Sequence, residues 1–415
     1  MTPSAISLLF SIGLAILPLG AVYWPESLGT LAASPGLLFL LAAVLLAPFS
    51  RPRRMPVFHQ LKLKRLMFVP VAGSIVSLAV FGFNPMFAAK FFSVGLLSLL
   101  WLSPLLLADY LSIRHLRTAA LVGIAICALA YVFSDLLNAL PSGIRDMLFG
   151  TAYQEAKEAR PRGFSEEPSQ FSATFSRLLI VWYLIEESRR RYNATRLIAF
   201  LCGLAVLLVA LGSKGAVVGI AIAMLSFTMG RRQLPYLVLA VPAAWWLANT
   251  QLDALTVDIE QFSSTATRAT LLVTGIVSTL ANPLGWGYYG FYGAIHSIGG
   301  WSLDWIGERF PVLLVFEARD IIEELNNVST NSTTLDFMVT FGWMFFWLMV
   351  RIVQSIRFHD PRVRACAVYV FISSFSTSGH LSILGFLAFA VMLRLYPQAV
   401  GTPAFAVMRP VPATT

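Results

Sequence analysis

The chain has 415 residues, of which 57% are hydrophobic and only 12% are charged, and its mean hydropathy is +0.73. This composition excludes an ordinary water-soluble domain, and repeated apolar runs of about 15–20 residues predict a polytopic membrane protein. The formal net charge of +9 does not indicate nucleic-acid binding, because most basic residues fall in short loops between the apolar runs.

The apolar runs predict an all-α membrane bundle of about 12 transmembrane helices, embedded in a lipid bilayer. The runs are continuous rather than alternating, which favours helices over strands because a helix satisfies its own backbone in lipid. The first run lacks a basic start and a cleavage site, so we expect a retained helix. The predicted helices are 5–22, 31–48, 66–83, 88–108, 118–136, 172–187, 197–211, 215–229, 234–250, 335–355, 365–378 and 381–395.

Five clusters of basic residues fix the predicted orientation. With the N-terminus inside, twelve helices place all five clusters on the cytoplasmic side, in agreement with the positive-inside rule. The simple interpretation of each cluster is topology and contact with lipid headgroups. The clusters lie within residues 51–65, 114–117, 189–196, 231–232 and 357–364.

We expect one integral membrane domain over residues 1–396, followed by a disordered cytoplasmic tail at 397–415. Two larger loops of mixed charge, at about 137–171 and 251–334, then face the periplasm. Within the second loop, residues 269–281 are apolar but short, and we interpret them as an interfacial or re-entrant helix. Cys127, Cys202 and Cys366 all fall in apolar runs, so we expect no disulfide, no metal site and no cofactor.

The segment Gly-Phe-Ser-Glu-Glu-Pro-Ser precedes the predicted helix 172–187 and contains Glu166 and Glu167. Acidic side chains at this position suit the N-terminal dipole of a helix, which is the structural interpretation. The functional interpretation is that one of the two carboxylates is a general base or orients a sugar hydroxyl. Burial beside lipid would raise its pKa and suit it for proton transfer.

Two cations stand at predicted helix starts on the same outer side. Lys214 lies in Gly-Ser-Lys-Gly, and Arg268 precedes the apolar residues 269–281. Each either snorkels to solvent or binds an anionic group. Residues 282–293, Asn-Pro-Leu-Gly-Trp-Gly-Tyr-Tyr-Gly-Phe-Tyr-Gly, predict a compact turn whose rings either stack on sugars or form an interfacial aromatic belt.

A run of Asn, Ser and Thr at 326–343 leads into the predicted helix 335–355 and offers amides and hydroxyls to a ligand. Asp336 is expected about one turn inside the membrane, where an acid is a functional candidate, although pairing with a basic residue is the structural alternative. His380 lies at another outer turn, where a single histidine is more often structural.

The order of these motifs resembles the Wzy-type polysaccharide polymerases, which form one superfamily with the O-antigen ligases. The resemblance spans about residues 130–345: the Gly-Phe-Ser-Glu-Glu-Pro-Ser segment, Gly-Ser-Lys-Gly, Arg268 followed by Asn-Pro-Leu-Gly-Trp-Gly, and Asn-Ser-Thr-Thr-Leu before Phe-Gly-Trp. It implies an inner-membrane glycosyltransferase that joins undecaprenyl-pyrophosphate-linked oligosaccharide repeat units at the periplasmic face. It also implies a chain-length regulator and a flippase as partners.

The resemblance implies roles for individual residues. Glu166 or Glu167 would be the catalytic base, and Arg268 would act in catalysis with them. Arg162, Lys214, Arg319, Asn331 and Asp336 would bind substrate. Lys214 stands where the family often has arginine, so the two-pronged grip on phosphate is lost there.

Two other functions remain open. An O-antigen ligase would share the donor, but ligases usually carry histidine before the helix that corresponds to 335–355, where this chain has Thr330-Asn331. A lipid-linked glycan flippase or transporter, which is not an enzyme, would place charges at mid-membrane depth. Lys90, Arg177 and Asp336 are expected near helix ends instead, which favours the enzyme.

Overall fold

The structure is a computed structural model without ligands. It describes residues 2–20, 31, 34–50, 56–134, 136, 163–164, 168–228, 264–309, 318–319, 322–323, 332–375 and 382–398.

In these residues the secondary structure is helical, apart from one isolated antiparallel bridge between Ile356 and Pro397. The helices are α1 (Pro3–Ile16), α2 (Gly36–Leu46), η2 (Ala47–Phe49), α3 (Pro56–Gln60), α4 (Leu63–Phe81), α5 (Pro85–Leu106), α6 (Ile113–Val132), α9 (Pro168–Glu187), α10 (Ala194–Ala210), α11 (Lys214–Thr228), α14 (Ser264–Ala281), α15 (Gly287–Arg309), α17 (Thr333–Phe341), α18 (Trp343–Ser355), α19 (Pro361–Ser373) and α20 (Ser382–Leu395).

The predicted all-α class is confirmed for the described residues, and these helices are consistent with a membrane protein. Three of them, α4, α5 and α6, are long and apolar enough to cross a bilayer, and α17 with α18 makes a fourth if the bent pair counts as one span. The outer face of α4 exposes Phe68, Ile75 and Val80, as lipid-facing residues would be. The count of twelve spans stays a prediction, and the expected helix at 234–250 lies outside the described residues.

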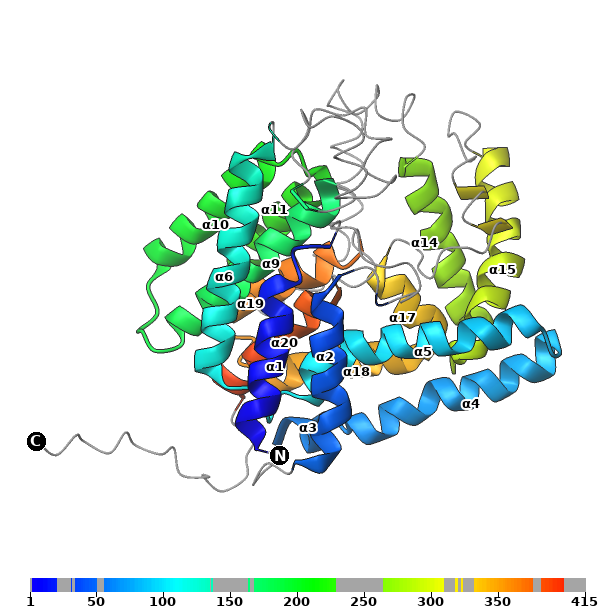
Figure 1. The fold of residues 1–415 in the computed structure, drawn as a ribbon. Helices are drawn as coiled ribbons and strands as arrows, with labels where there is room; N and C mark the ends of the chain where they lie inside the picture. Colours follow the sequence, from blue (N-terminus) through cyan, green and yellow to red (C-terminus); the bar gives the residue numbers. More distant parts are fainter. Residues whose placement is uncertain are drawn as a thin grey trace, which may run out of the picture.

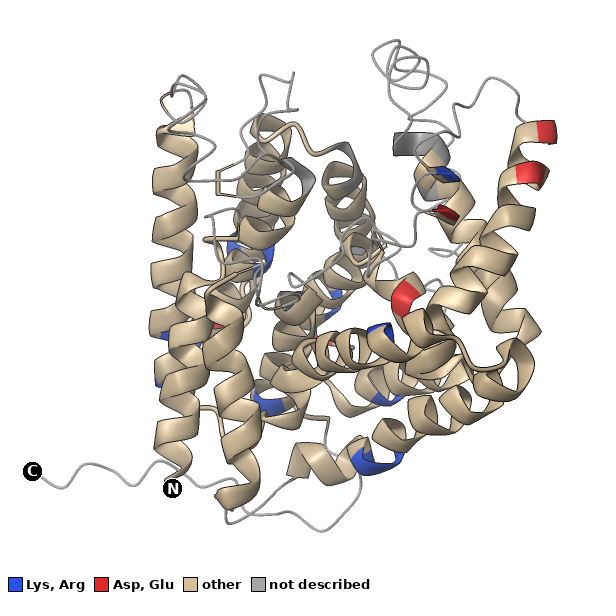
Figure 2. Cartoon of the chain, turned by 45° about the vertical axis from the view of Figure 1, so that its right-hand side comes forward, with Lys and Arg blue, Asp and Glu red and all other residues tan. Residues whose placement is uncertain are grey.

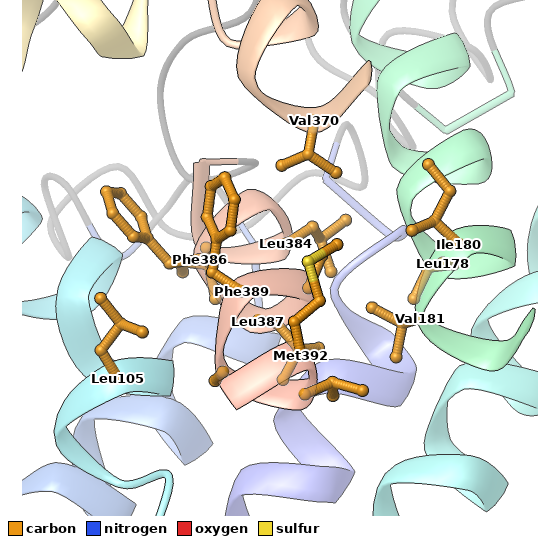
Figure 3. Packing of buried hydrophobic residues seen from close by; sticks show 14 of the residues in the cluster. Leu105, Leu178, Ile180, Val181, Val370, Leu384, Phe386, Leu387, Phe389 and Met392 are labelled. Carbon is orange, nitrogen blue, oxygen red and sulfur yellow. The ribbon is translucent and has the colours of Figure 1, made fainter. Parts of the chain in front are cut away.

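The helices form two packed groups (Figure 1). In the larger group, α20 packs between α5 and α9, and its apolar side chains meet residues of α5, α9 and α19, such as Leu105, Val181 and Val370 (Figure 3). The second group consists of α14 and α15, which rise from α4 and α5 over a separate core that includes Phe87, Tyr289 and Val339.

The prediction of one continuous helix over 335–355 was wrong. The chain bends by 118° between α17 and α18, and Gly342 at the bend has φ +56°. The turn 282–286 provides hydrogen-bond partners for backbone groups beside the bend. The Trp343 N–H donates to the Pro283 carbonyl, and the Trp286 N–H donates to the Val339 carbonyl, with a nitrogen–oxygen distance of 2.8 Å in each case. Broken helices persist at membrane depth where such protein partners replace the lost bonds.

The region expected as a large loop at 251–334 contains two long helices in its described part. α14 begins at Ser264, earlier than expected, so Arg268 lies within it rather than before it. The compact turn predicted for 282–293 ends after Trp286, because Gly287 starts the 23-residue helix α15. Gly290 and Gly293 allow α15 to approach Ser77 and Phe81 of α4 closely, which explains the alternation of glycines and aromatics as packing.

One end of the bundle, called the basic end below, gathers the described parts of four predicted basic loops. The Asp109 carboxylate accepts from the main-chain N–H groups of Val57 and Phe58, and Arg117 pairs with Glu186. Arg351 donates to the Gln60 carbonyl at 3.2 Å. Most lysines and arginines of the described chain lie in the lower half of Figure 2, towards this end.

The basic end is held by one buried carboxylate. Glu187 lies 3.1 Å from Arg196 and 3.9 Å from Arg362, and Arg362 also pairs with Asp360 at 2.7 Å. These groups join the loop after α9 to the loop before α19. The contacts confirm that the described parts of these loops lie on one side of the molecule, as the charge pattern predicts.

Candidate functional site

Most of the predicted catalytic segment lies outside the described residues. This applies to Arg162, Glu166, Glu167 and Asn331, and also to His380. The neighbours of the two glutamates are described: Gly163, with φ +56°, lies against the ring of Phe171 in the first turn of α9. The α9 helix begins at Pro168, so the two glutamates immediately precede its N-terminus, as predicted.

Lys214 and Arg268 occupy early turns of two helices. Lys214 is the first residue of α11, and Arg268 is the fifth residue of α14, while the side chains of both lie outside the described part. The α10 helix starts at the basic end, near Arg196, and its 17 residues span about 25 Å. The α11 helix follows directly after α10, so it starts about 25 Å away from the basic end. The α9 helix ends at the basic end with Glu187, so Pro168 lies about 30 Å away on the same side as Lys214.

Arg319 lies on the surface, with its side chain 57% exposed and 3.6 Å from Glu323. Its neighbours Ala318 and Ile322 are buried in the core beneath α15. This position fixes the backbone of Arg319 on α15, and its exposed ion pair leaves the guanidinium accessible to solvent.

Asp336 is fully buried in the first turn of α17, and its depth in the membrane stays a prediction. It shares a helix face with Val339, which packs in the core of α14 and α15, and it lies near the phenol of Tyr292. The Lys90 ammonium lies 5.4 Å from the centre of the Tyr292 ring. Asp336 therefore faces the α14–α15 group.

Arg177 is a fully buried cation in the middle of a helix, a position at which the sequence predicted no charge. Arg177, predicted near a helix end, is the tenth residue of the 20-residue helix α9 and has no exposed surface. That prediction was wrong because α9 begins four residues earlier than its apolar run. The Arg177 guanidinium donates to Ser373 Oγ at 3.2 Å. Gly385 of α20 lies beside the guanidinium, since a Cβ atom there would be in ordinary van der Waals contact with Arg177 Cζ at 3.8 Å.

Hydroxyl groups from three chain segments line the same cavity as this cation. Thr334 Oγ1 and Ser374 Oγ lie 2.6 Å apart, and Thr333 shares a short hydrogen bond with Ser382. These residues bring together the start of α17, the end of α19 and the start of α20. The bend at Gly342 makes this possible, because it lets α17 enter the bundle at a different angle from α18.

A cavity lies between these hydroxyls and the apolar side chains of α18, α19 and α20. Phe386 and Phe389 project from one face of α20 and Val370 from α19 (Figure 3), and all three line it. Including its open mouth, the cavity holds about 330 Å³ of empty space, little of it wide enough for a water molecule. Met349 and Phe371, both half-buried, lie at its edge.

This arrangement offers cationic and hydroxyl donors inside an apolar shell. Such a site can bind an anion or a sugar hydroxyl. Within the described residues no group of three or more His, Cys, Asp or Glu side chains could hold a metal ion.

The sequence interpretation did not treat Arg177, Ser374 or Ser382 as site residues, whereas Thr333 and Thr334 belong to the run at 326–343 that it proposed to offer hydroxyls to a ligand. An arginine inside an apolar run is itself a functional signal. The run Phe-Ser-Ala-Thr-Phe-Ser-Arg, with its small hydroxyl residues, shows that this helix face is polar.

Comparison with known proteins adds one relative. No protein-family profile matches the chain. The chain is similar to an uncharacterised 49.5 kDa protein in the cps region of Klebsiella pneumoniae, with 29% identity over 260 residues. The similarity covers 60% of this chain and 58% of that protein.

Proposed function

We propose that this chain is a polysaccharide polymerase that joins undecaprenyl-pyrophosphate-linked oligosaccharide repeat units at the periplasmic face of the bacterial inner membrane. The relative in a cps region, a capsule polysaccharide gene region, supports a role in polysaccharide biosynthesis. The order of motifs across residues 130–345 supports polymerisation within that role.

The proposal rests on one observation. The helices that begin at the sequence motifs start at the side of the bundle away from the basic end. α9 begins directly after Glu166 and Glu167, and α11 begins at Lys214, both about 25–30 Å from the basic end by helix length. α14 and α15 rise away from α4 and α5 (Figure 1). If the basic end is cytoplasmic, the motifs meet the periplasm, where the lipid-linked donor is presented.

In the proposed reaction, a sugar hydroxyl oxygen attacks the anomeric carbon of the donor. The bond from that carbon to the pyrophosphate oxygen breaks, and the undecaprenyl pyrophosphate leaves with the bonding electrons. Glu166 or Glu167 takes the hydroxyl proton. Lys214 and Arg268 stabilise the charge that develops on the pyrophosphate, with Arg162 or Arg319 as further cations. Asn331 and Asp336 would orient the sugars.

A second function is favoured by the depth of two charges. Arg177 and Asp336 are both fully buried, Arg177 halfway along its helix. Charges at mid-membrane depth are typical of transport pathways. A flippase for a lipid-linked glycan, which moves its substrate without covalent chemistry, is therefore the alternative that the experiment must separate from a polymerase.

The test is the polysaccharide profile of cells that lack the gene, complemented with wild type or with Glu166→Gln/Glu167→Gln, Lys214→Ala or Arg268→Ala. We expect each variant to reach the membrane, to lose long chains and to leave single repeat units exported. Cys202→Ser, an exposed position on α10, serves as the matched control. Repeat units trapped in the cytoplasm would indicate the flippase, and normal polymer in all three variants would overturn the site.

A further inference from the structure

We infer that the exposed face of α15 between Trp301 and Glu308, called the tryptophan face below, binds an uncharged stretch of a sugar chain outside the membrane. That this sugar chain is the oligosaccharide on which the protein acts rests on the proposed function. The binding itself needs no lipid-linked donor and no catalysis, so it can be tested separately.

The side chains of the tryptophan face form one continuous stripe. Trp301, Asp304 and Glu308 lie three and four residues apart, so they share one side of α15. All three are exposed, and Trp301 is exposed to 50%, whereas Leu303 and Ile306 are buried on the opposite side. The stripe extends about 10 Å along the helix axis, which is longer than a single sugar ring.

The aromatic rings are held in place by their neighbours on the same helix. The rings of Trp301 and Trp305 stack with their centroids 6.3 Å apart and an angle of 30° between their planes. The Arg309 guanidinium lies over the Trp305 ring, 4.6 Å from its centre. Three planar groups thus follow one another at steps of four residues. An aromatic surface that is fixed in advance loses little conformational entropy when a ligand stacks on it.

The chemistry of this face matches an uncharged sugar. A sugar ring has an apolar C–H side, which packs on an indole, and hydroxyl groups around its rim. The carboxylates of Asp304 and Glu308 stand beside the indoles and accept hydrogen bonds from such hydroxyls. The same carboxylates repel phosphate groups and acidic sugars, so the tryptophan face selects an uncharged stretch of the chain.

The tryptophan face lies well past the contact between α15 and α4. Gly290 lies against Ser77, and Gly293 lies against Phe81, the last residue of α4. Trp301 follows Gly293 by about 12 Å along the helix. The helix rises away from α4 in Figure 1 and carries acidic residues at its far end in Figure 2. Carboxylates on the same side as Trp301 favour contact with water rather than with lipid.

This face is also close to a predicted substrate-binding residue. Gly299 of α15 lies against Ile322, and Ile322 belongs to the same short segment as Arg319. The segment therefore lies within about one helix diameter, 10–12 Å, of the tryptophan face. A sugar chain on this face would extend towards the cation that the sequence predicts to bind substrate.

The experiment measures sugar binding to the purified full chain in phosphatidylcholine nanodiscs. The probes are oligosaccharides released by partial acid hydrolysis from the surface polysaccharide of the strain that carries the gene. Anion exchange separates their uncharged and acidic fractions, and titration followed by ligand-detected NMR gives the affinity for each. Trp301→Ala removes the open ring, Trp301→Phe retains an aromatic ring, and Asp304→Asn/Glu308→Gln removes both charges. Trp343→Ala is the matched control, because Trp343 is a 52% exposed tryptophan on α18.

We expect wild type and Trp343→Ala to bind the uncharged fraction alike, and Trp301→Ala to bind it about fivefold more weakly. Trp301→Phe should bind within about twofold of wild type, because the aromatic ring remains. The double variant should bind the uncharged fraction more weakly and the acidic fraction more tightly than wild type does.

No binding of the uncharged fraction to wild type would overturn the inference. Full binding by Trp301→Ala would also overturn it and would leave Trp301 as an interfacial anchor. Equal affinity of wild type for both fractions would overturn the selection by charge. Sugar binding that depends on Trp301 in a protein that does not polymerise would overturn the proposed function alone, whereas polymerisation without such binding would overturn this inference alone.

Discussion

Two buried arginines of this protein lie in different surroundings. Arg362, at the basic end, pairs with Asp360 at 2.7 Å and donates to the main-chain oxygens of Glu187 and Arg190. It also stands over the ring of Tyr396 at 5.4 Å. Charged and carbonyl acceptors from separate loops thus surround Arg362, which is what a cation needs to hold those loops together.

Arg177, by contrast, lies halfway along α9 beside a cavity lined with hydroxyls. Ser373, which accepts a hydrogen bond from the Arg177 guanidinium, is neutral and itself donates to the Val370 carbonyl. The described contacts of the two arginines thus differ: Arg362 links separate loops at the basic end, whereas Arg177 contacts a hydroxyl group beside a cavity. Burial alone therefore does not define the role of an arginine.

The largest expected effect comes from removing the cation at the basic end. Arg362→Ala would remove one ion-pair partner from the buried Glu187 carboxylate. It would also leave the main-chain carbonyls of Glu187 and Arg190 without the hydrogen bonds that Arg362 donates. We expect a loss of about 3–5 kcal/mol in unfolding free energy. Thermal unfolding of the detergent-solubilised protein measures it, with the exposed Arg189→Ala as control. An unchanged midpoint would remove the distinction between the two arginines.

The next effect concerns the bend that brings α17 to the cavity. Gly342 has φ +56°, and a Cβ atom there would lie 2.2 Å from the Pro283 carbonyl oxygen. Gly342→Ala should cost about 1–3 kcal/mol from the backbone conformation alone, with steric overlap added.

Gly203→Ala is the matched control for this prediction, because nothing lies within 4 Å of a Cβ atom at that position of α10. It should leave stability unchanged or raise it by up to about 1 kcal/mol. Equal thermal midpoints for the two glycine variants would show that the bend does not depend on Gly342.

The smallest effect is a pH dependence at the basic end. Burial raises the pKa of Asp109 above its ordinary value of 3.8, although bonds from Phe58 and Val57 oppose the shift. A carboxyl with a raised pKa gives stability that is fully present below its unfolded pKa and is lost as pH rises through the folded pKa.

The thermal midpoint of wild type should therefore fall more steeply than that of Asp109→Asn as pH rises from about 4. Asp304→Asn, at an exposed position of α15, is the control. Parallel midpoint curves for wild type and Asp109→Asn would mean that Asp109 is not buried as described.

The fold could be predicted where local pattern decides it. Apolar runs identified α5, α10 and α20 to within about three residues at each end, and the basic clusters predicted which loops share one side. The bend at Gly342 escaped prediction because its cause is distant in sequence: the turn 282–286 supplies the bonds that replace the helix. α15 escaped because glycines that pack against α4 look like turn residues when read alone.

The candidate site was predictable only in part. Asp336 lies near the start of a helix, as expected, and Lys214 begins α11 one residue before the predicted start at 215. Whether the side chains of Glu166, Lys214 and Arg268 meet depends on tertiary packing, and it stays a prediction. The cavity at Arg177 could not be predicted, because it forms only where α9, α17, α19 and α20 converge.

The most direct test of the central claim is polymerisation by the purified protein. The full chain is reconstituted in lipid vesicles with undecaprenyl-pyrophosphate-linked repeat units, and product length and released undecaprenyl pyrophosphate are measured. We predict chains of two or more units, with one carrier released for each bond formed, and no product from Glu166→Gln/Glu167→Gln. Unchanged repeat units that only cross the bilayer would contradict it.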